Sequence, residues 1–208
     1  MPLLSYALTS LSDVKESLGI AGGDTSKDSL IIRKINQATE MIEAYCQLAK
    51  DHHFASTTYT NEEYDGSGID QISLKMRPVI TLSSFAYRDT TQNYASWTNA
   101  DATLYFTDLN AGVIDLLWNQ TRDWNRYRVT YTAGYATIPA DLAEACVTLA
   151  GYLVENSATG TSVKRKREGA REIEYFAPAT ADTGSLIGSL GLDNMLARYI
   201  NYVILEDK

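Results

Sequence analysis

The chain has 208 residues, 45% of them hydrophobic and 21% charged, which is a globular composition and enough length for one large domain or a domain with an insert. Its formal net charge of −8 argues against a protein that grips nucleic acid over its whole surface. No run reaches the roughly 18 apolar residues of a membrane-spanning helix and no signal peptide is visible, so we expect a protein made in a cytoplasm, without a membrane partner.

Two cysteines and an excess of tyrosine stand out in the composition. Cys46 and Cys146 fall at apolar positions of expected helices, so we expect buried free thiols in a reducing compartment, while a disulfide between them stays open. Fourteen tyrosines accompany only four phenylalanines. Tyrosine suits surfaces that are buried at one end and hydrated at the other, so subunit contacts and tyrosine-rich strands explain this excess equally well.

Residues 1–51 are expected to form an N-terminal helical part. Ser10 can cap a first helix, with Asp13 three residues later as in a capping box, and Gly19 ends that helix. After a polar loop, a second helix begins within residues 24–28 and runs to about Ala49. Its apolar positions repeat at intervals of four and three, which predicts one stripe packed on other helices: Ile31, Ile35, Ala38, Ile42, Tyr45 and Ala49.

Residues 52–132 change character, because helical spacing gives way to short alternating runs with turns at 65–68 and 110–112. Tyr127, Val129 and Tyr131 alternate with polar residues in the last run, the period of a half-buried strand. About six strands fit this pattern. They predict a small antiparallel sheet or barrel that is inserted between helices.

A strand passes directly into a helix at residues 129–142. Gly134, followed by Tyr135, breaks the strand where φ is expected to be positive or another backbone comes close. Pro139 suits the first helical position, and Asp141 places a carboxylate at the positive end of the helix dipole. These four residues are expected to form a structural turn.

The remainder of the chain mixes charged and flexible stretches. A basic run at 164–167 follows the helix, and residues 133–176 are expected to complete the helical core. Residues 177–208 are expected to form a Pro/Ala/Thr/Gly linker and a C-terminal docking segment. The predicted fold is α+β and mainly helical: a small helical bundle with an inserted antiparallel β domain and an extended C-terminal arm that ends in a short helix.

No constellation in the sequence points to catalysis, a cofactor or a metal. His52 and His53 are adjacent and point to different sides, so they make a poor ligand pair, and we expect a solvated loop there. Glu62, Glu63 and Asp65 could form a carboxylate cluster, but a solvated hairpin explains them better. The cysteines lack CxxC spacing, and no glycine loop for phosphates or dinucleotides is present. We therefore expect no enzyme.

Several of these segments together resemble the head–tail connector (adaptor) proteins of tailed bacteriophages. The motifs that carry the resemblance are Leu-Ser-Asp-Val-Lys at 11–15, Glu-Ala-Tyr-Cys at 43–46, Tyr-Asp-Gly-Ser-Gly at 64–68, and Thr-Ala-Gly-Tyr with Ile-Pro-Ala-Asp-Leu at 132–142. None of these motifs is diagnostic alone. Their agreement in order over most of the chain is what identifies the chain as similar to this family.

The resemblance implies a structural protein of the virion neck, between head and tail. It implies a ring of 12 copies below the portal, joined to the portal and to a stopper or tail-completion protein, with a channel for double-stranded DNA that is contacted without regard to sequence. In such connectors the C-terminal region docks into the portal. That role falls here on residues 192–208, with the apolar side chains of Leu192, Leu196, Tyr199 and Ile200.

The basic run is the most distinctive chemical feature. Lys164, Arg165, Lys166 and Arg167 repel one another, so the run is either solvated or paired with an anionic partner. DNA in the channel and an acidic protein surface both fit, and we favour the DNA. Two other functions stay open: a small enzyme with an inserted β domain, which would need a polar site, and a nucleic-acid-binding module, which the net charge disfavours.

Overall fold

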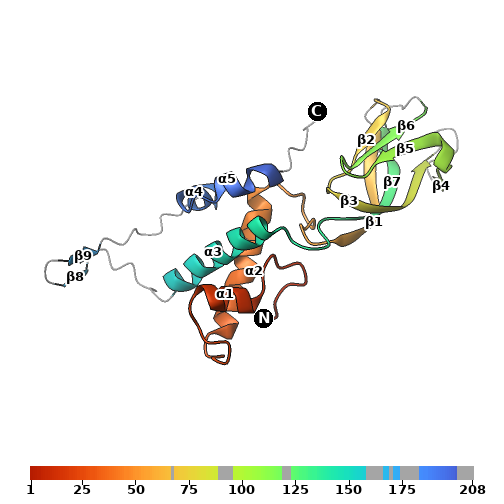
Figure 1. Cartoon of the computed structure of the whole chain (residues 1–208). Helices are drawn as coiled ribbons and strands as arrows, with labels where there is room; N and C mark the ends of the chain where they lie inside the picture. The colour runs from red at the N-terminus through yellow and green to blue at the C-terminus, as the bar shows by residue number, and fades with distance from the viewer. Residues whose placement is uncertain are drawn as a thin grey trace. The chain divides into compact units, whose positions relative to one another are not determined.

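The structure of the chain is a computed structural model, and it describes residues 1–66, 68–88, 96–118, 123–157, 166–168, 171–173 and 183–200 (Figure 1). The chain forms two compact units. The helical unit combines Met1–Gln47 with Ile138–Lys208, and the β unit is the continuous stretch Leu48–Thr137. Helices and strands take similar shares of the described residues. The fold is therefore α+β as predicted, but the expectation that it is mainly helical is wrong.

The helical unit is organised around two long helices that pack on each other. They are α2 (Asp28–Tyr45) and α3 (Ala140–Ser157). The predicted stripe of α2 lies in the core, and so does the apolar side of α3: Ile31, Ile35, Ala38, Ile42, Leu142, Cys146 and Leu149 have no exposed surface. Cys46 and Cys146 are both buried free thiols, and burial raises the pKa of each to about 12.

Helix α2 ends four residues before the predicted Ala49, at Tyr45. Gln47 has a φ of 59°, in the left-handed region, and this conformation stops the helix. Helix α1 (Leu11–Ser17) begins as predicted, because Ser10 and Asp13 form both bonds of a capping box.

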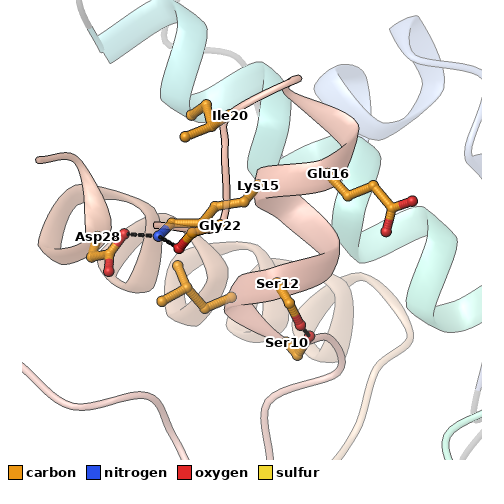
Figure 2. Close-up of a pocket in the computed structure, with 8 residues that line it drawn as sticks. Ser10, Ser12, Lys15, Glu16, Ile20, Gly22 and Asp28 are labelled. Carbon is orange, nitrogen blue, oxygen red and sulfur yellow. Dashed lines mark hydrogen bonds and ion pairs between the residues drawn. The ribbon is translucent and has the colours of Figure 1, made fainter. Parts of the chain in front are cut away.

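Lys15 on α1 is a buried cation that fastens the loop between α1 and α2 (Figure 2). Its Nζ lies 2.5 Å from Oδ1 of Asp28 and donates to the carbonyl oxygen of Asp24 at 2.7 Å. A second, longer bond of 3.5 Å reaches the carbonyl oxygen of Gly22. A buried ammonium group is tolerated only with such partners, so Lys15 fixes the position of the polar loop.

The β unit contains two antiparallel sheets in its described residues. The four-stranded sheet has the order β1 (Thr57–Gly66), β7 (Asp123–Ala133), β3 (Val79–Arg88) and β4 (Trp97–Asn99). The three-stranded sheet has the order β2 (Gln71–Ser73), β6 (Val113–Leu116) and β5 (Tyr105–Asp108), with a 3-10 turn, η1 (Ala102–Leu104), before β5. Tyr127, Val129 and Tyr131 of the central strand β7 are fully buried, as their alternation predicts.

The C-terminal part of the described chain packs on the helical unit. It consists of α4 (Thr183–Ser189), α5 (Asp193–Leu196) and the 3-10 turn η2 (Ala197–Tyr199). Helix α4 contacts α2, and α5 contacts α3. Ile187, Leu192 and Leu196 are buried. None of the helices in the described ranges is long and apolar enough to span a membrane.

Candidate functional site

The turn at Gly134 is built by close approach of two backbone segments of the β unit. Gly134 has a φ of 102°, and a Cβ atom placed on it would lie 2.7 Å from the carbonyl oxygen of Phe54 and 2.8 Å from that of Ala55. The next residue, Tyr135, donates its N–H to Phe54 at 2.7 Å and accepts from the N–H of Ser56 at 3.0 Å. Only glycine fits this backbone conformation without strain and without a collision.

Asp141, in the first turn of α3, holds the C-terminal segment. Pro139 lies just before the helix, and its carbonyl oxygen accepts the N–H of Ala143 at 3.0 Å. The carboxylate of Asp141 accepts the hydroxyl of Tyr199 at 2.6 Å and a guanidinium N–H of Arg198. Desolvation acts to raise the pKa of Asp141, but the bonds from Tyr199 and Arg198 outweigh it and keep that pKa below its usual value. No local pattern in the sequence predicts this contact, because it joins residues 58 positions apart.

The four apolar residues expected to dock into the portal do not form one exposed surface. Leu192 is 4% exposed and Leu196 is fully buried, so both belong to the core of the helical unit. Tyr199 and Ile200 are half-buried. The C-terminal arm expected to be extended is therefore packed into the core at Leu192 and Leu196.

The basic run falls partly outside the described residues. Lys164 and Arg165 lie outside them, while Lys166 and Arg167 belong to strand β8 (Lys166–Glu168). Strand β8 pairs with β9 (Arg171–Ile173) in an antiparallel hairpin, with Lys166 opposite Ile173 and Arg167 opposite Glu172. Residues 171–173 thus form the second strand of a hairpin.

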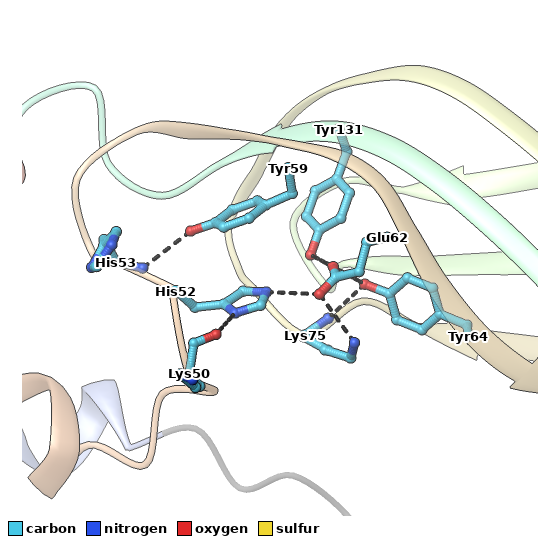
Figure 3. A network of polar contacts seen from close by, with 8 residues as sticks. All are labelled: Lys50, His52, His53, Tyr59, Glu62, Tyr64, Lys75 and Tyr131. Carbon is cyan, nitrogen blue, oxygen red and sulfur yellow. Dashed lines mark hydrogen bonds and ion pairs between the residues drawn. The ribbon is translucent and has the colours of Figure 1, made fainter. Parts of the chain in front are cut away.

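A polar cluster inside the β unit was not predicted (Figure 3). One oxygen of Glu62 lies 3.0 Å from Nε2 of His52 and 3.1 Å from Nζ of Lys75. The other oxygen accepts the hydroxyls of Tyr64 at 2.6 Å and Tyr131 at 2.7 Å. The carboxylate is therefore surrounded by donors from the two strands β1 and β7, from the bend after β2 and from the loop before β1.

The cluster overturns two expectations from the sequence. His52 is 7% exposed, with its ring stacked at 4.4 Å on Tyr59, so it does not lie in a solvated loop. Glu62 has a side chain only 13% exposed, so it does not belong to a solvated hairpin. A bulge in β1 explains the difference: the register shifts between Tyr59 and Glu62, and Asn61 has a φ of 56°. The extra residue turns Glu62 toward the interior.

The pKa shifts in the cluster indicate a structural role for Glu62. Desolvation acts to raise the pKa of Glu62, but the bonds from its four donors outweigh it and lower that pKa to about 2. Desolvation acts to lower the pKa of His52, yet its bond to Glu62 raises that pKa overall. A carboxylate already engaged by four donors has no free position for a substrate proton. Among the described residues, no group of three or more His, Cys, Asp or Glu could hold a metal ion.

The fold is shared with chains in solved structures of gene transfer agent particles. The matches include the neck of an empty gene transfer agent particle computed with C6 symmetry (TM-score 0.56, 16% identity), the virion of a native gene transfer agent particle (0.55, 17%) and the neck of a native particle computed with C12 symmetry (0.52, 18%). Each match covers 100% of this chain and 96% or 97% of the other. No curated protein sequence is significantly similar to this chain.

Comparison of the sequence with protein families identifies the chain more specifically than its fold does. The sequence model of the head completion proteins matches residues 7–170, and the chain belongs to that family. It is a structural head completion protein, a component that connects head to tail, and it is not an enzyme. The predicted resemblance to head–tail connectors is confirmed.

Proposed function

We propose that this chain forms a ring of 12 copies below the portal and joins the portal to the stopper or tail-completion protein that follows. Double-stranded DNA passes through the ring and is contacted only through its phosphates. The observation that carries the proposal is the match of the head completion family over residues 7–170. The necks with a similar fold support the ring, because they were computed with C6 and C12 symmetry.

The helical unit has exposed helix faces that can contact neighbouring copies. A ring needs two different faces on each copy, because its contacts are head-to-tail. Helices α2 and α3 bury one side each against the other, while Arg33 and Glu40 of α2 and Tyr152 of α3 are exposed. These outward sides are free to meet other subunits.

We assign the portal contact to the end of the chain. Leu192 and Leu196 anchor α5 in the helical unit and Tyr199 is bonded to Asp141, which leaves Ile200 and the residues after it for the portal. Residues 201–208 contain the apolar run Tyr-Val-Ile-Leu, which a small tail cannot bury by itself. A segment anchored at one end and apolar at the other is suited to docking.

The cationic run is assigned to an anionic partner within the neck. Four consecutive cations gain most when an acidic surface or a phosphate backbone lies against them. Lys164, Arg165, Lys166 and Arg167 therefore contact either the DNA in the channel or an acidic protein surface.

Electron microscopy of particles tests the proposed ring. Particles that carry the full chain are expected to show 12 copies seated on the portal. Particles made with a chain that lacks residues 201–208 are expected to have heads without this ring, although the shortened chain keeps the circular dichroism of the full one. Any other copy number, or density for the chain elsewhere in the particle, would overturn the proposal.

A further inference from the structure

The three-stranded sheet of the β unit has one side that no other part of the described chain covers. Its inner side contributes Ile72, Ile114 and Leu116 to the core, with 4%, 1% and 5% of their surfaces exposed. Side chains alternate along a strand, so the neighbours of these residues point outward. The outer side is therefore defined by the residues between them.

The outer side carries a group of large apolar side chains, which we call the outer face. Leu104 and Leu117 are joined by a backbone bond of 2.9 Å, and Phe106 lies opposite Asp115. The backbone bond from Leu116 to Asp70, 2.8 Å long, places Ile69, just before β2, next to Leu117, just after β6. The exposed fractions are 56% for Ile69, 42% for Leu104, 64% for Phe106 and 56% for Leu117. An apolar group of this kind, gathered at one end of the three-stranded sheet, marks a contact surface.

The charged residues of the outer face are all acidic. Asp115 lies within it and accepts the side-chain amide of Gln71 at 2.9 Å. Asp108 lies at the end of β5 and accepts the N–H groups of Asn110 and Ala111 at 3.0 and 2.9 Å. Neither lysine nor arginine occurs at 69–73, 104–108 or 113–117. The face repels DNA phosphates and favours a partner that combines cations with apolar contact.

Strand β5 is also open along its length. It is the last strand in the order β2–β6–β5, so among the described strands it pairs on one side only. An open edge next to an exposed apolar face accepts a further strand or hairpin from a partner.

We infer that a second copy of this chain docks on the outer face through its β8–β9 hairpin. The hairpin is short and antiparallel, and residues 164–173 carry five cations against two carboxylates, Glu168 and Glu172. It supplies the positive charge that the outer face lacks. This inference rests on the proposed ring, in which identical copies meet repeatedly through two different surfaces. It assigns the basic run to a neighbouring subunit and not to DNA.

Photo-crosslinking within assembled particles tests this contact directly. Benzoylphenylalanine replaces Phe106, which is exposed and contributes little to the core. Irradiation is expected to give a product with twice the mass of the chain, in which residue 106 is joined to a peptide from 164–173. The same amino acid in place of Ile80, which is 40% exposed on β3 of the other sheet, is expected to give no such product.

The other outcomes are equally informative. A link from residue 106 to another virion protein, to DNA or to its own chain, or no link at all, overturns the inference. Microscopy of the same particles separates this failure from that of the proposed function. A normal 12-copy ring with a different crosslink refutes only the proposed hairpin contact. An absent ring refutes the proposed function itself.

A charge exchange provides a second test of the contact. Asp108→Asn with Asp115→Lys makes the outer face less acidic, and asparagine keeps a side-chain oxygen for the turn. Lys166→Glu with Arg167→Gln changes the hairpin by the same amount in the opposite sense. Each pair alone is expected to lower the yield of particles with complete necks at least about tenfold, because like charges face one another.

The two pairs combined are expected to restore the yield to within about threefold of the natural chain. Lys27→Glu, at an exposed position just before α2, serves as the matched control, because it reverses a cation outside the hairpin and is not expected to rescue the altered face. Circular dichroism confirms that every variant is folded. If the combined variant is no better than the single pairs, the hairpin does not meet the outer face.

Discussion

Tyr199 donates its hydroxyl to Asp141 across 2.6 Å, which ties the last turn of the described chain to the first turn of α3. Arg198 donates to the second oxygen of the same carboxylate. Together with the buried Leu196, this contact keeps the C-terminal segment on the helical unit. It is also the last described contact before the tail that we assign to the portal.

Tyr199→Phe should loosen the end of the chain without unfolding the rest. A hydrogen bond to a charged group contributes about 1.5–3 kcal/mol, and this one is partly exposed, so we expect a loss near the lower end. Hydrogen exchange of peptides from 193–200 should become faster, while peptides from α2 stay unchanged. Arg198→Ala should have a smaller effect, because its side chain is 65% exposed. Equal exchange in Tyr199→Phe and the natural chain would show that the bond from Tyr199 to Asp141 does not hold the C-terminal segment in place.

Two truncations should behave differently. A chain that ends at Ile200 keeps every buried residue of α4 and α5 and should unfold like the full chain. A chain that ends at Gly191 loses Leu192 and Leu196 and uncovers Ile187, and loss of such buried side chains costs about 2–5 kcal/mol each. Thermal unfolding followed by circular dichroism distinguishes them. An equally stable shorter chain would show that α5 is not part of the core.

Replacing Gly134 by alanine should already destabilise the β unit. The added methyl group would meet two carbonyl oxygens at 2.7 and 2.8 Å, in a backbone conformation that alanine resists. We expect a loss of more than about 1 kcal/mol, with valine worse than alanine. Gly22→Ala is the control, because a Cβ atom there meets nothing within 4 Å. Denaturant unfolding measures both, and equal stability of the two variants would be inconsistent with the collision.

The pair formed by His52 and Glu62 should make the β unit sensitive to pH. The lowered pKa of Glu62 contributes stability above its ordinary value of 4.5, and this is lost as the pH falls toward about 2. The raised pKa of His52 contributes stability below its ordinary value of 6.5, and this is lost as the pH rises through the pKa of the folded state. Both contributions are present between these two ordinary values.

Substitution of His52 by glutamine should abolish the loss of stability that accompanies the rise in pH above 6.5. The difference in unfolding free energy between the natural chain and His52→Gln should shrink as the pH rises from 6 to 8. Tryptophan fluorescence is the measurement of choice, because Trp97, Trp118 and Trp124 all lie in the β unit. A difference that is constant over this range would mean that folding leaves the pKa of His52 unchanged.

Local patterns in the sequence predicted the elements that depend on local rules. The capping box at Ser10, the stripe through Ile31 and Ile42, and the alternation of Tyr127 and Val129 each reflect a period or a cap that only a few neighbouring residues define. The start of α3 after Pro139 follows for the same reason.

Features that depend on distant residues or on one irregular residue were missed. Glu62 is buried because a bulge shifts β1 by one position, and no composition signal marks that bulge. Leu192 and Leu196 follow a linker-like stretch, so the sequence favoured a detached arm, whereas tertiary packing on α2 and α3 decides their burial. The bond between Tyr199 and Asp141 joins residues 58 positions apart, beyond the reach of any local pattern.

The division of the chain also sets an order of events during synthesis. The β unit is one uninterrupted stretch, so it can fold as soon as residue 137 has left the ribosome. The helical unit must wait, since Thr39 on α2 approaches Cys146 on α3, 107 positions later in the chain, at 3.7 Å. Until α3 emerges, the apolar stripe of α2 has no partner. A nascent chain therefore carries a finished β unit next to an unpaired helix, and that helix is the stretch a chaperone would need to shield.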